Sequence, residues 1–119
     1  MSGDKRRVLI VDSAPSVTES LKMIFDRVGC DCRTAHSAEE ALALGWTPDA
    51  VIIEFILQNM NGLECAKLLR DRHPNCGMIL IYAQVADCLI RDAEEAGFQV
   101  FAKPVSPQVL MSAAGIKAD

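Results

Sequence analysis

Short runs of apolar residues alternate along this chain with longer stretches in which apolar residues recur at helical spacing. The runs 8–11 and 51–53 are unbroken and rich in β-branched residues, which is typical of strands covered on both faces of a sheet. The same pattern predicts three further strands, at 30–34, 78–81 and 98–102. The sequence therefore predicts five strands.

The segments between these strands carry the start and stop signals of helices. Pro15 suits a first helical turn, and Gly29 closes a segment whose apolar side chains share one face. Ser37 and Glu40 have the spacing of a capping box, which opens a short helix. Three more helices are expected: from residue 61 to the turn at Pro74, over 85–96, and from residue 107 to Gly115.

Strand and helix alternate five times along the chain. Such alternation predicts an α/β domain with a doubly wound, five-stranded parallel sheet, right-handed crossovers and helices on both faces. The 119 residues fit a single domain, whose core we expect at about 7–114 between tails at 1–6 and 115–119. In this fold, sites form at the edge of the sheet where the strands end.

Composition narrows the class of protein. Half of the residues are apolar and the net charge is −4, which favours a soluble domain and argues against binding to nucleic acid. No apolar run approaches the length of a membrane span, so we expect a cytoplasmic protein that does not bind membranes. The five cysteines include no C-x-x-C pair and lie in apolar patterns, which is typical of buried, reduced thiols. Cys30 and Cys32 have the spacing that directs both sulfurs to one face of a strand.

Polar side chains follow four of the predicted strands. Asp12 and Ser13 follow the first strand, Glu54 the third, Tyr82 the fourth and Lys103 the fifth. Because parallel strands end at the same edge of a sheet, the sequence predicts that two carboxylates, a phenol and an ammonium group surround one crevice.

Six motifs, in this order and spacing, resemble the receiver domain of two-component signalling from about residue 7 to residue 110. They are VLIVD (8–12), SAEEAL (37–42), PDAVII (48–53), GLE (62–64), EAG (95–97) and FAKP (101–104). The resemblance implies a flavodoxin-like fold with the strand order 2-1-3-4-5. It also implies a function, because receivers accept a phosphoryl group from a histidine kinase on an aspartate after the third strand.

The acidic positions of the family are only partly kept in this chain. Receivers hold Mg²⁺ with two acidic residues after the first strand; Asp12 matches the first of these, but Ser13 stands at the second. Glu54 occupies the position of the phosphoaccepting aspartate. Mg²⁺ requires near-octahedral oxygen geometry, and the longer glutamate moves its carboxylate by about 1.5 Å. We therefore expect a weak or lost Mg²⁺ site at Asp12 and Glu54, no other cofactor, and very slow phosphotransfer.

Among the remaining family positions, one is kept and two are exchanged. Lys103, followed by Pro104, matches the lysine that contacts the phosphoryl oxygens, and the family implies a cis peptide bond between them. Tyr82 stands where a small hydroxyl residue belongs, and Val100 stands where an aromatic side chain relays the signal by changing rotamer. We hypothesise that Tyr82 fills the space beside Val100 and fixes the relay in one packing. Neutral drift in a disused site is the alternative.

Glu54 has two interpretations. An ion pair between Glu54 and Lys103 would either stand in permanently for the phosphorylated state or be an ordinary salt bridge in a vestigial site. The sequence leaves both interpretations open.

The preferred function is a pseudo-receiver, a non-enzymatic signalling module that binds protein partners without phosphorylation. The resemblance implies a histidine kinase, a phosphotransfer protein or an output domain as the partner. It also implies that the surface of the fourth helix, fifth strand and fifth helix, at 85–96, 98–102 and 107–110, serves either self-association as a homodimer or contact with an effector. The alternative is a functional phosphoacceptor response regulator with a rearranged Mg²⁺ site. A third possibility is a piece of a larger regulator.

Overall fold

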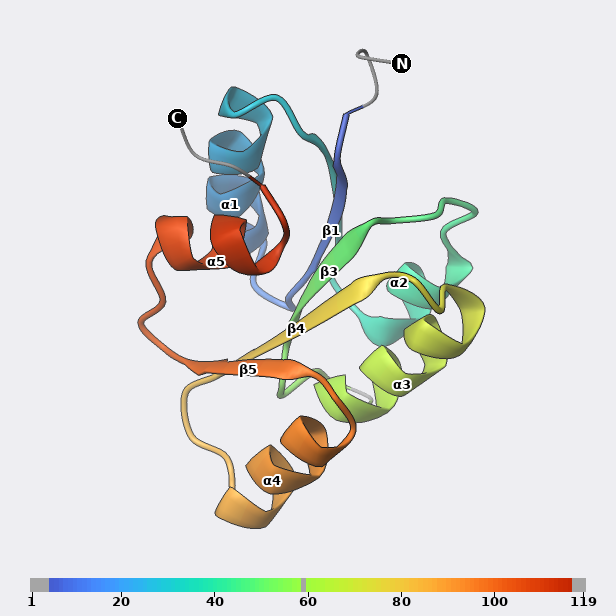
Figure 1. Ribbon diagram of the computed structural model, residues 1–119, viewed down its shortest axis with the longest axis vertical. Coiled ribbons are helices and arrows are strands. Elements are labelled where there is room, and N and C mark those ends of the chain that lie inside the picture. Colours follow the sequence, from blue (N-terminus) through green and yellow to red (C-terminus); the bar gives the residue numbers. More distant parts are fainter. Residues whose placement is uncertain (1–4, 59, 117–119) are drawn as a thin grey trace.

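The computed structural model of this protein describes residues 5–58 and 60–116. Within these residues, five strands and five helices alternate (Figure 1). The strands are β1 (Arg7–Val11), β2 (Asp31–Ala35), β3 (Ala50–Glu54), β4 (Gly77–Tyr82) and β5 (Gln99–Ala102). The helices are α1 (Pro15–Arg27), α2 (Ala38–Ala43), α3 (Gly62–Arg72), α4 (Asp87–Glu95) and α5 (Pro107–Ala113). Each element lies within a few residues of the range that the sequence predicts.

All five strands are parallel and form one sheet in the order β2-β1-β3-β4-β5. Helices α1 and α5 lie on one face of the sheet, and α2, α3 and α4 lie on the other (Figure 1). The predicted doubly wound fold and its strand order are confirmed. Winding changes direction between β1 and β3, so the ends of these two strands flank the crevice where sites of this fold form.

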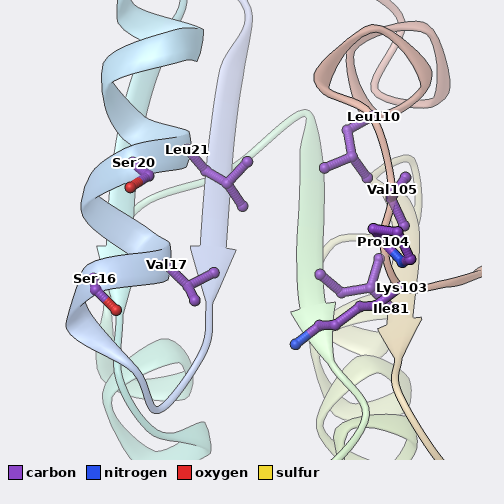
Figure 2. A pocket seen from close by; sticks show the side chains of 9 residues that line it. All are labelled: Ser16, Val17, Ser20, Leu21, Ile81, Lys103, Pro104, Val105 and Leu110. Atoms are coloured by element: carbon purple, nitrogen blue, oxygen red, sulfur yellow. The ribbon is translucent and has the colours of Figure 1, made fainter.

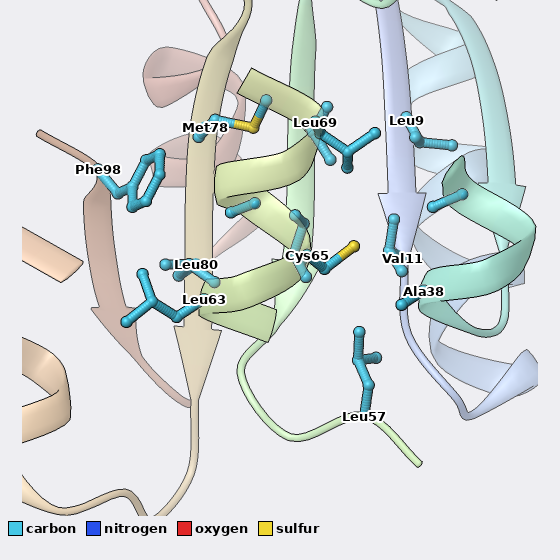
Figure 3. Close-up of a cluster of buried hydrophobic side chains, with 14 of the residues drawn as sticks. Leu9, Val11, Ala38, Leu57, Leu63, Cys65, Leu69, Met78, Leu80 and Phe98 are labelled. Atoms are coloured by element: carbon cyan, nitrogen blue, oxygen red, sulfur yellow. The ribbon is translucent and has the colours of Figure 1, made fainter. Parts of the chain in front are cut away.

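Two hydrophobic cores cover the two faces of the sheet. The larger one lies against α2, α3 and α4, and Figure 3 shows Leu9 of β1, Leu69 of α3 and Leu80 of β4 within it. The smaller one lies against α1 and α5 and includes Ile10 and Phe25. Successive residues of a strand point to opposite faces, and all five residues of β3 are buried. A strand buried on both faces explains its continuous run of apolar residues.

Local signals explain where the helices begin and end. The hydroxyl of Ser37 accepts a hydrogen bond from the backbone N–H of Glu40 at 3.1 Å, as the capping box predicts. Gly29 and Gly97 both have φ of 90°, a left-handed conformation that favours glycine just after a helix. None of the helices in the described part of the chain is long and apolar enough to cross a membrane.

The two ends of the described chain contact each other. Nε of Arg6 donates a hydrogen bond to the carbonyl oxygen of Ala114 at 2.9 Å, and Ile116 packs against the core beneath α1 and α5. Residues 6 and 116, which we expected in the tails, therefore contact the fold. The remaining tail residues, 1–4 and 117–119, lie outside the described residues.

Four of the five cysteines are buried, and burial changes their acidity. Burial, with a smaller effect from the charge of Asp26, raises the pKa of Cys32 to about 12. Burial also raises the pKa of Cys65 and of Cys76 to about 11, and it raises the pKa of Cys30. Cys88, on α4, is exposed.

Gly62 generates a first testable prediction, because the first residue of α3 lies against the backbone of β3. A Cβ at Gly62 would lie 2.9 Å from the Cα of Phe55 and closer still to the carbonyl oxygen of Glu54. We expect Gly62→Ala to lower the free energy of unfolding by roughly 1–3 kcal/mol, because backbone atoms must move apart. Gly45→Ala is the matched control, since nothing lies within 4 Å of its Cβ position. Urea unfolding measures the free energy of unfolding of both variants. An equal loss in the two variants would contradict the close packing of Gly62 against β3.

The thiols generate a second prediction. At pH 8 we expect iodoacetamide to modify Cys88 in the native chain and all five cysteines in denaturant. The raised pKa values favour the protonated thiols of the folded state, so their contribution to stability is complete below the ordinary thiol pKa of 9.0. It is lost as the pH rises towards 11 to 12. Peptide mapping by mass spectrometry checks the labelling, and modification of Cys65 as fast as Cys88 would contradict it.

Candidate functional site

Three charged side chains meet at the edge of the sheet where the strands end. Asp12 follows β1, Glu54 is the last residue of β3, and Lys103 follows β5. Val11 lies opposite Ile53 in the register of β1 and β3, so Asp12 and Glu54 stand side by side on neighbouring strands. Two carboxylates and one ammonium group therefore share this crevice.

Glu54 and Lys103 form an ion pair. Nζ of Lys103 donates a hydrogen bond to Oε1 of Glu54. The side chain of Glu54 is 11% exposed and that of Lys103 is 35% exposed, so the pair is partly removed from water. Loss of Lys103 would leave the buried carboxylate of Glu54 without a charged partner. Figure 2 shows the Lys103 side chain extending toward the end of β3.

The backbone around Lys103 is held by β4. The backbone N–H of Lys103 donates to the carbonyl oxygen of Tyr82 at 2.7 Å, which continues the pairing of β4 and β5 beyond the end of β5. The peptide bond between Lys103 and Pro104 is cis, as the resemblance implies. These contacts place the base of the Lys103 side chain beside the crevice.

A groove of about 710 Å³ opens beside Lys103, between α1 and the segment that leads into α5 (Figure 2). Its walls are largely apolar, with Val17 and Leu21 of α1 on one side and Val105 and Leu110 on the other. The ion pair therefore lies at one end of an open apolar groove.

Asp12 is a buried carboxylate with one unpaired oxygen. The residue is only 4% exposed. Its Oδ1 accepts a hydrogen bond from the backbone N–H of Ala14 at 2.9 Å, which shapes the turn into α1. Its Oδ2 has no hydrogen-bond partner among the described residues. This oxygen has lost its hydration without gaining a donor, an unfavourable situation for a carboxylate.

The donors in the crevice do not match what Mg²⁺ requires, which is about six oxygens in near-ideal octahedral geometry. Ser13 is exposed and carries no charge, and the Oε1 of Glu54 is bound to Lys103. Within residues 5–58 and 60–116, no cluster of three or more His, Cys, Asp or Glu side chains could hold a metal ion. The two carboxylates of Asp12 and Glu54, one of them bound to Lys103, do not supply the oxygen shell of this ion.

Tyr82 and Val100 lie on the other face of the sheet from the ion pair. Val100 lies opposite Leu80 in the register of β4 and β5, and Tyr82 is two residues further along the same face. Both side chains pack against the core beneath α2, α3 and α4. Tyr82 also borders a surface pocket with Asp87 and Arg91 of α4. The five predicted site residues thus form two groups, one on each face of the sheet.

Sequence reasoning missed two contacts that position the crevice. The backbone N–H of Gly62 donates to the carbonyl oxygen of Phe55 at 2.6 Å, which draws α3 against the end of β3. The hydroxyl of Thr18, fully buried in α1, lies 3.0 Å from Nε2 of His36 in the turn after β2. A glycine at the start of a helix was the one available signal for the first contact. Nothing in the local pattern around Thr18 or His36 signals the second.

Comparison with known proteins gives matches over most of this chain. Residues 8–115 match the response regulator receiver domain. The chemotaxis protein CheY of Thermotoga maritima is 30% identical over 112 residues, which cover 91% of this chain and 93% of that protein. The alkaline phosphatase synthesis transcriptional regulatory protein PhoP of Bacillus subtilis is 27% identical over 87% of this chain and 44% of its own length. The chain spans less than half the length of this and two other curated relatives, both from Mycobacterium tuberculosis.

Solved structures show the same fold. A CheY-like receiver domain from Methanospirillum hungatei superimposes with a TM-score of 0.85 at 24% identity, covering 92% of this chain and 90% of that one. A response regulator from Burkholderia pseudomallei, crystallised with a phosphorylated aspartic acid, a calcium ion and citrate, gives 0.84 at 24% identity, covering 93% and 66%. The match over residues 8–115 is consistent with the strand order and with the edge at which the charged side chains meet. This chain therefore belongs to the response regulator receiver domain family.

Proposed function

We propose that this receiver domain acts as a pseudo-receiver, which signals by binding protein partners without being phosphorylated. Receiver domains are signalling modules of two-component systems rather than catalytic enzymes. The observation that carries the proposal is the ion pair between Glu54 and Lys103. It engages the carboxylate and the ammonium group that phosphotransfer would need, according to the family resemblance.

Three features of the crevice oppose phosphotransfer. Glu54 stands at the position that the resemblance assigns to the phosphoacceptor, and its carboxylate is about 1.5 Å further from the backbone than that of aspartate. Lys103 binds this carboxylate, and Ser13 contributes no charge toward Mg²⁺. Phosphoryl transfer depends on positioning and charge neutralisation, so a misplacement of about 1 Å can cost on the order of a hundredfold in rate. The Burkholderia pseudomallei protein, by contrast, carries its phosphate on an aspartic acid.

The ion pair gives the domain a single, permanent arrangement of the crevice. The carboxylate of Glu54 binds Lys103 in place of a phosphoryl group, and so mimics one aspect of a phosphorylated receiver. On the other face, Tyr82 packs against the same core as Val100 and restricts the rearrangement that an aromatic relay would undergo. A domain fixed in this way binds its partner regardless of kinase activity.

The partner surface in this proposal is the face of α4, β5 and α5, which lie next to one another in Figure 1. Its exposed residues include Asp87 and Arg91 of α4, Gln99 of β5, and Val109 of α5, which is 41% exposed. A mixture of charged and apolar side chains suits a protein partner. A cytoplasmic histidine kinase, phosphotransfer protein, output domain or second copy of this chain has the required chemistry.

A functional phosphoacceptor is the second candidate, and Asp12 favours it, because its buried Oδ2 has no hydrogen-bond partner among the described residues and a cation would supply one. Intact-mass measurement after incubation with Mg²⁺ and acetyl phosphate separates the two candidates. We expect the natural chain to gain no phosphate, and the Glu54→Asp/Ser13→Asp variant to gain one, because it restores both acidic positions. Phosphate on the natural chain, located in the crevice by peptide mapping, would replace the pseudo-receiver proposal with the phosphoacceptor.

Asp12 generates a further prediction. If no cation neutralises its buried carboxylate, Asp12→Asn removes an uncompensated charge and keeps the Oδ1 that accepts from Ala14. We expect the free energy of unfolding to rise by about 1 kcal/mol. Asp71→Asn, at an exposed position of α3, is the control and should change it by less than about 0.5 kcal/mol. Urea unfolding should give the natural chain the same free energy of unfolding in Mg²⁺ and in EDTA. If Mg²⁺ stabilised the natural chain but not Asp12→Asn, the result would contradict the pseudo-receiver proposal.

A further inference from the structure

We propose that Arg70 of α3 is a latch that holds α4 against the sheet, and that α4 opens as a separate unit when this latch is released. This inference rests on the proposed function, because α4 belongs to the proposed partner surface. It adds a means of regulation, since the order of α4 then decides whether that surface is formed. Opening of α4 is a property of the free chain, so its test needs no phosphate and no partner protein.

Helix α4 has little anchorage of its own. Ala93 is the one buried residue among the nine of Asp87–Glu95, while Leu89 and Ile90 are partly exposed. Its N-cap residue, Ala86, offers no side-chain hydrogen bond, whereas the N-cap side chains of α2, α3 and α5 each accept one. A helix that buries few apolar side chains opens locally at a low cost in free energy.

The C-terminal end of α4 carries unfavourable charges. Glu94 and Glu95 are exposed in its last turn, and this turn contains no basic residue. The C-terminus of a helix bears a partial negative charge, and its last carbonyl groups lack partners within the helix. Negative side chains at this end destabilise the helix, so the end needs a positive group from another part of the chain.

Arg70 supplies this positive group. Its Nη1 donates a hydrogen bond to the carbonyl oxygen of Ala96, the C-cap residue of α4. Its guanidinium carbon lies 4.3 Å from the ring centre of Phe98, which is 5% exposed. A guanidinium group over an aromatic ring makes a favourable cation–π contact. One side chain of α3 therefore holds both the end of α4 and the start of the segment that leads into β5.

The latch connects α4 to the helix that begins at the crevice. Helices α3 and α4 lie on the same face of the sheet (Figure 1). The backbone N–H of Gly62 fixes the start of α3 to Phe55, directly after Glu54, and Arg70 lies in the last turn of the same helix. Release of Arg70 would free α4 and leave this attachment of α3 and the ion pair of the crevice in place. The domain thus keeps one movable element beside a fixed crevice.

Hydrogen–deuterium exchange, followed by mass spectrometry of peptides, measures the opening of α4. In Arg70→Met and Arg70→Gln we expect the amides of residues 87–97 to exchange at least about tenfold faster than in the natural chain, because a charged hydrogen bond is lost. Arg70→Lys should restore part of the protection, since it keeps the charge but not the planar group. Arg72→Met is the matched control, because Arg72 of α3 donates to Leu42 rather than to α4.

Cleavage by trypsin under native conditions is a second measurement. Arg91 lies inside α4 and Lys22 inside α1, so cleavage after Arg91 reports the opening of α4 and cleavage after Lys22 that of α1. We expect Arg70→Met to accelerate cleavage after Arg91 alone.

The latch would be refuted by exchange of α4 that is unchanged in Arg70→Met, or by acceleration that is equal in all elements. Equal acceleration would show a loss of global stability instead. Phosphorylation of the natural chain would overturn the proposed function and not the latch, and the intact-mass experiment detects it separately.

Discussion

A carboxylate at the end of a strand that is buried on both faces needs a positive charge within reach. Glu54 is in this position, because every residue of β3 is buried and the strand leads directly into the crevice. Lys103 supplies the charge from beyond the end of β5, two strands away in the sheet. The pairing of β3 with β4 and of β4 with β5 brings the two groups together. The chemistry of the crevice therefore depends on the correct register of these three strands. A shift of β5 by one residue would turn Lys103 to the other face.

Most of the fold could be predicted because independent local signals agree. Pro15 begins α1, Ser37 caps α2, and Gly29 follows the helix that it was expected to end. The strand order could not be derived from these signals, since neighbours in a parallel sheet are set by contacts between distant segments. The resemblance to receivers supplied the order, and the structure has it.

The candidate site could be predicted only in part. Asp12, Glu54 and Lys103 were expected at one edge because each follows a strand, and they lie there. The hydrogen bonding of individual oxygens could not be predicted from the sequence. One oxygen of Asp12 accepts a hydrogen bond from the backbone N–H of Ala14, and the other has no partner in the described chain. The separation of Tyr82 from the ion pair follows from the alternation of side chains along β4, a one-residue difference from Ile81, which lies beside Glu54.

The hydrogen bond between Arg6 and Ala114 has a consequence for how the domain is made. The two residues are 108 positions apart, and the layer of α1 and α5 is complete only when they meet. A chain that emerges from the ribosome from its N-terminus forms β1 and α1 first and must leave their apolar sides uncovered until α5 arrives. The entropic cost of closing a long loop grows only slowly with its length, so the large separation of Arg6 and Ala114 adds little to the free-energy cost of bringing them together. The core beneath α1 and α5 can therefore be completed only after α5, the last helix of the described chain, has been synthesised.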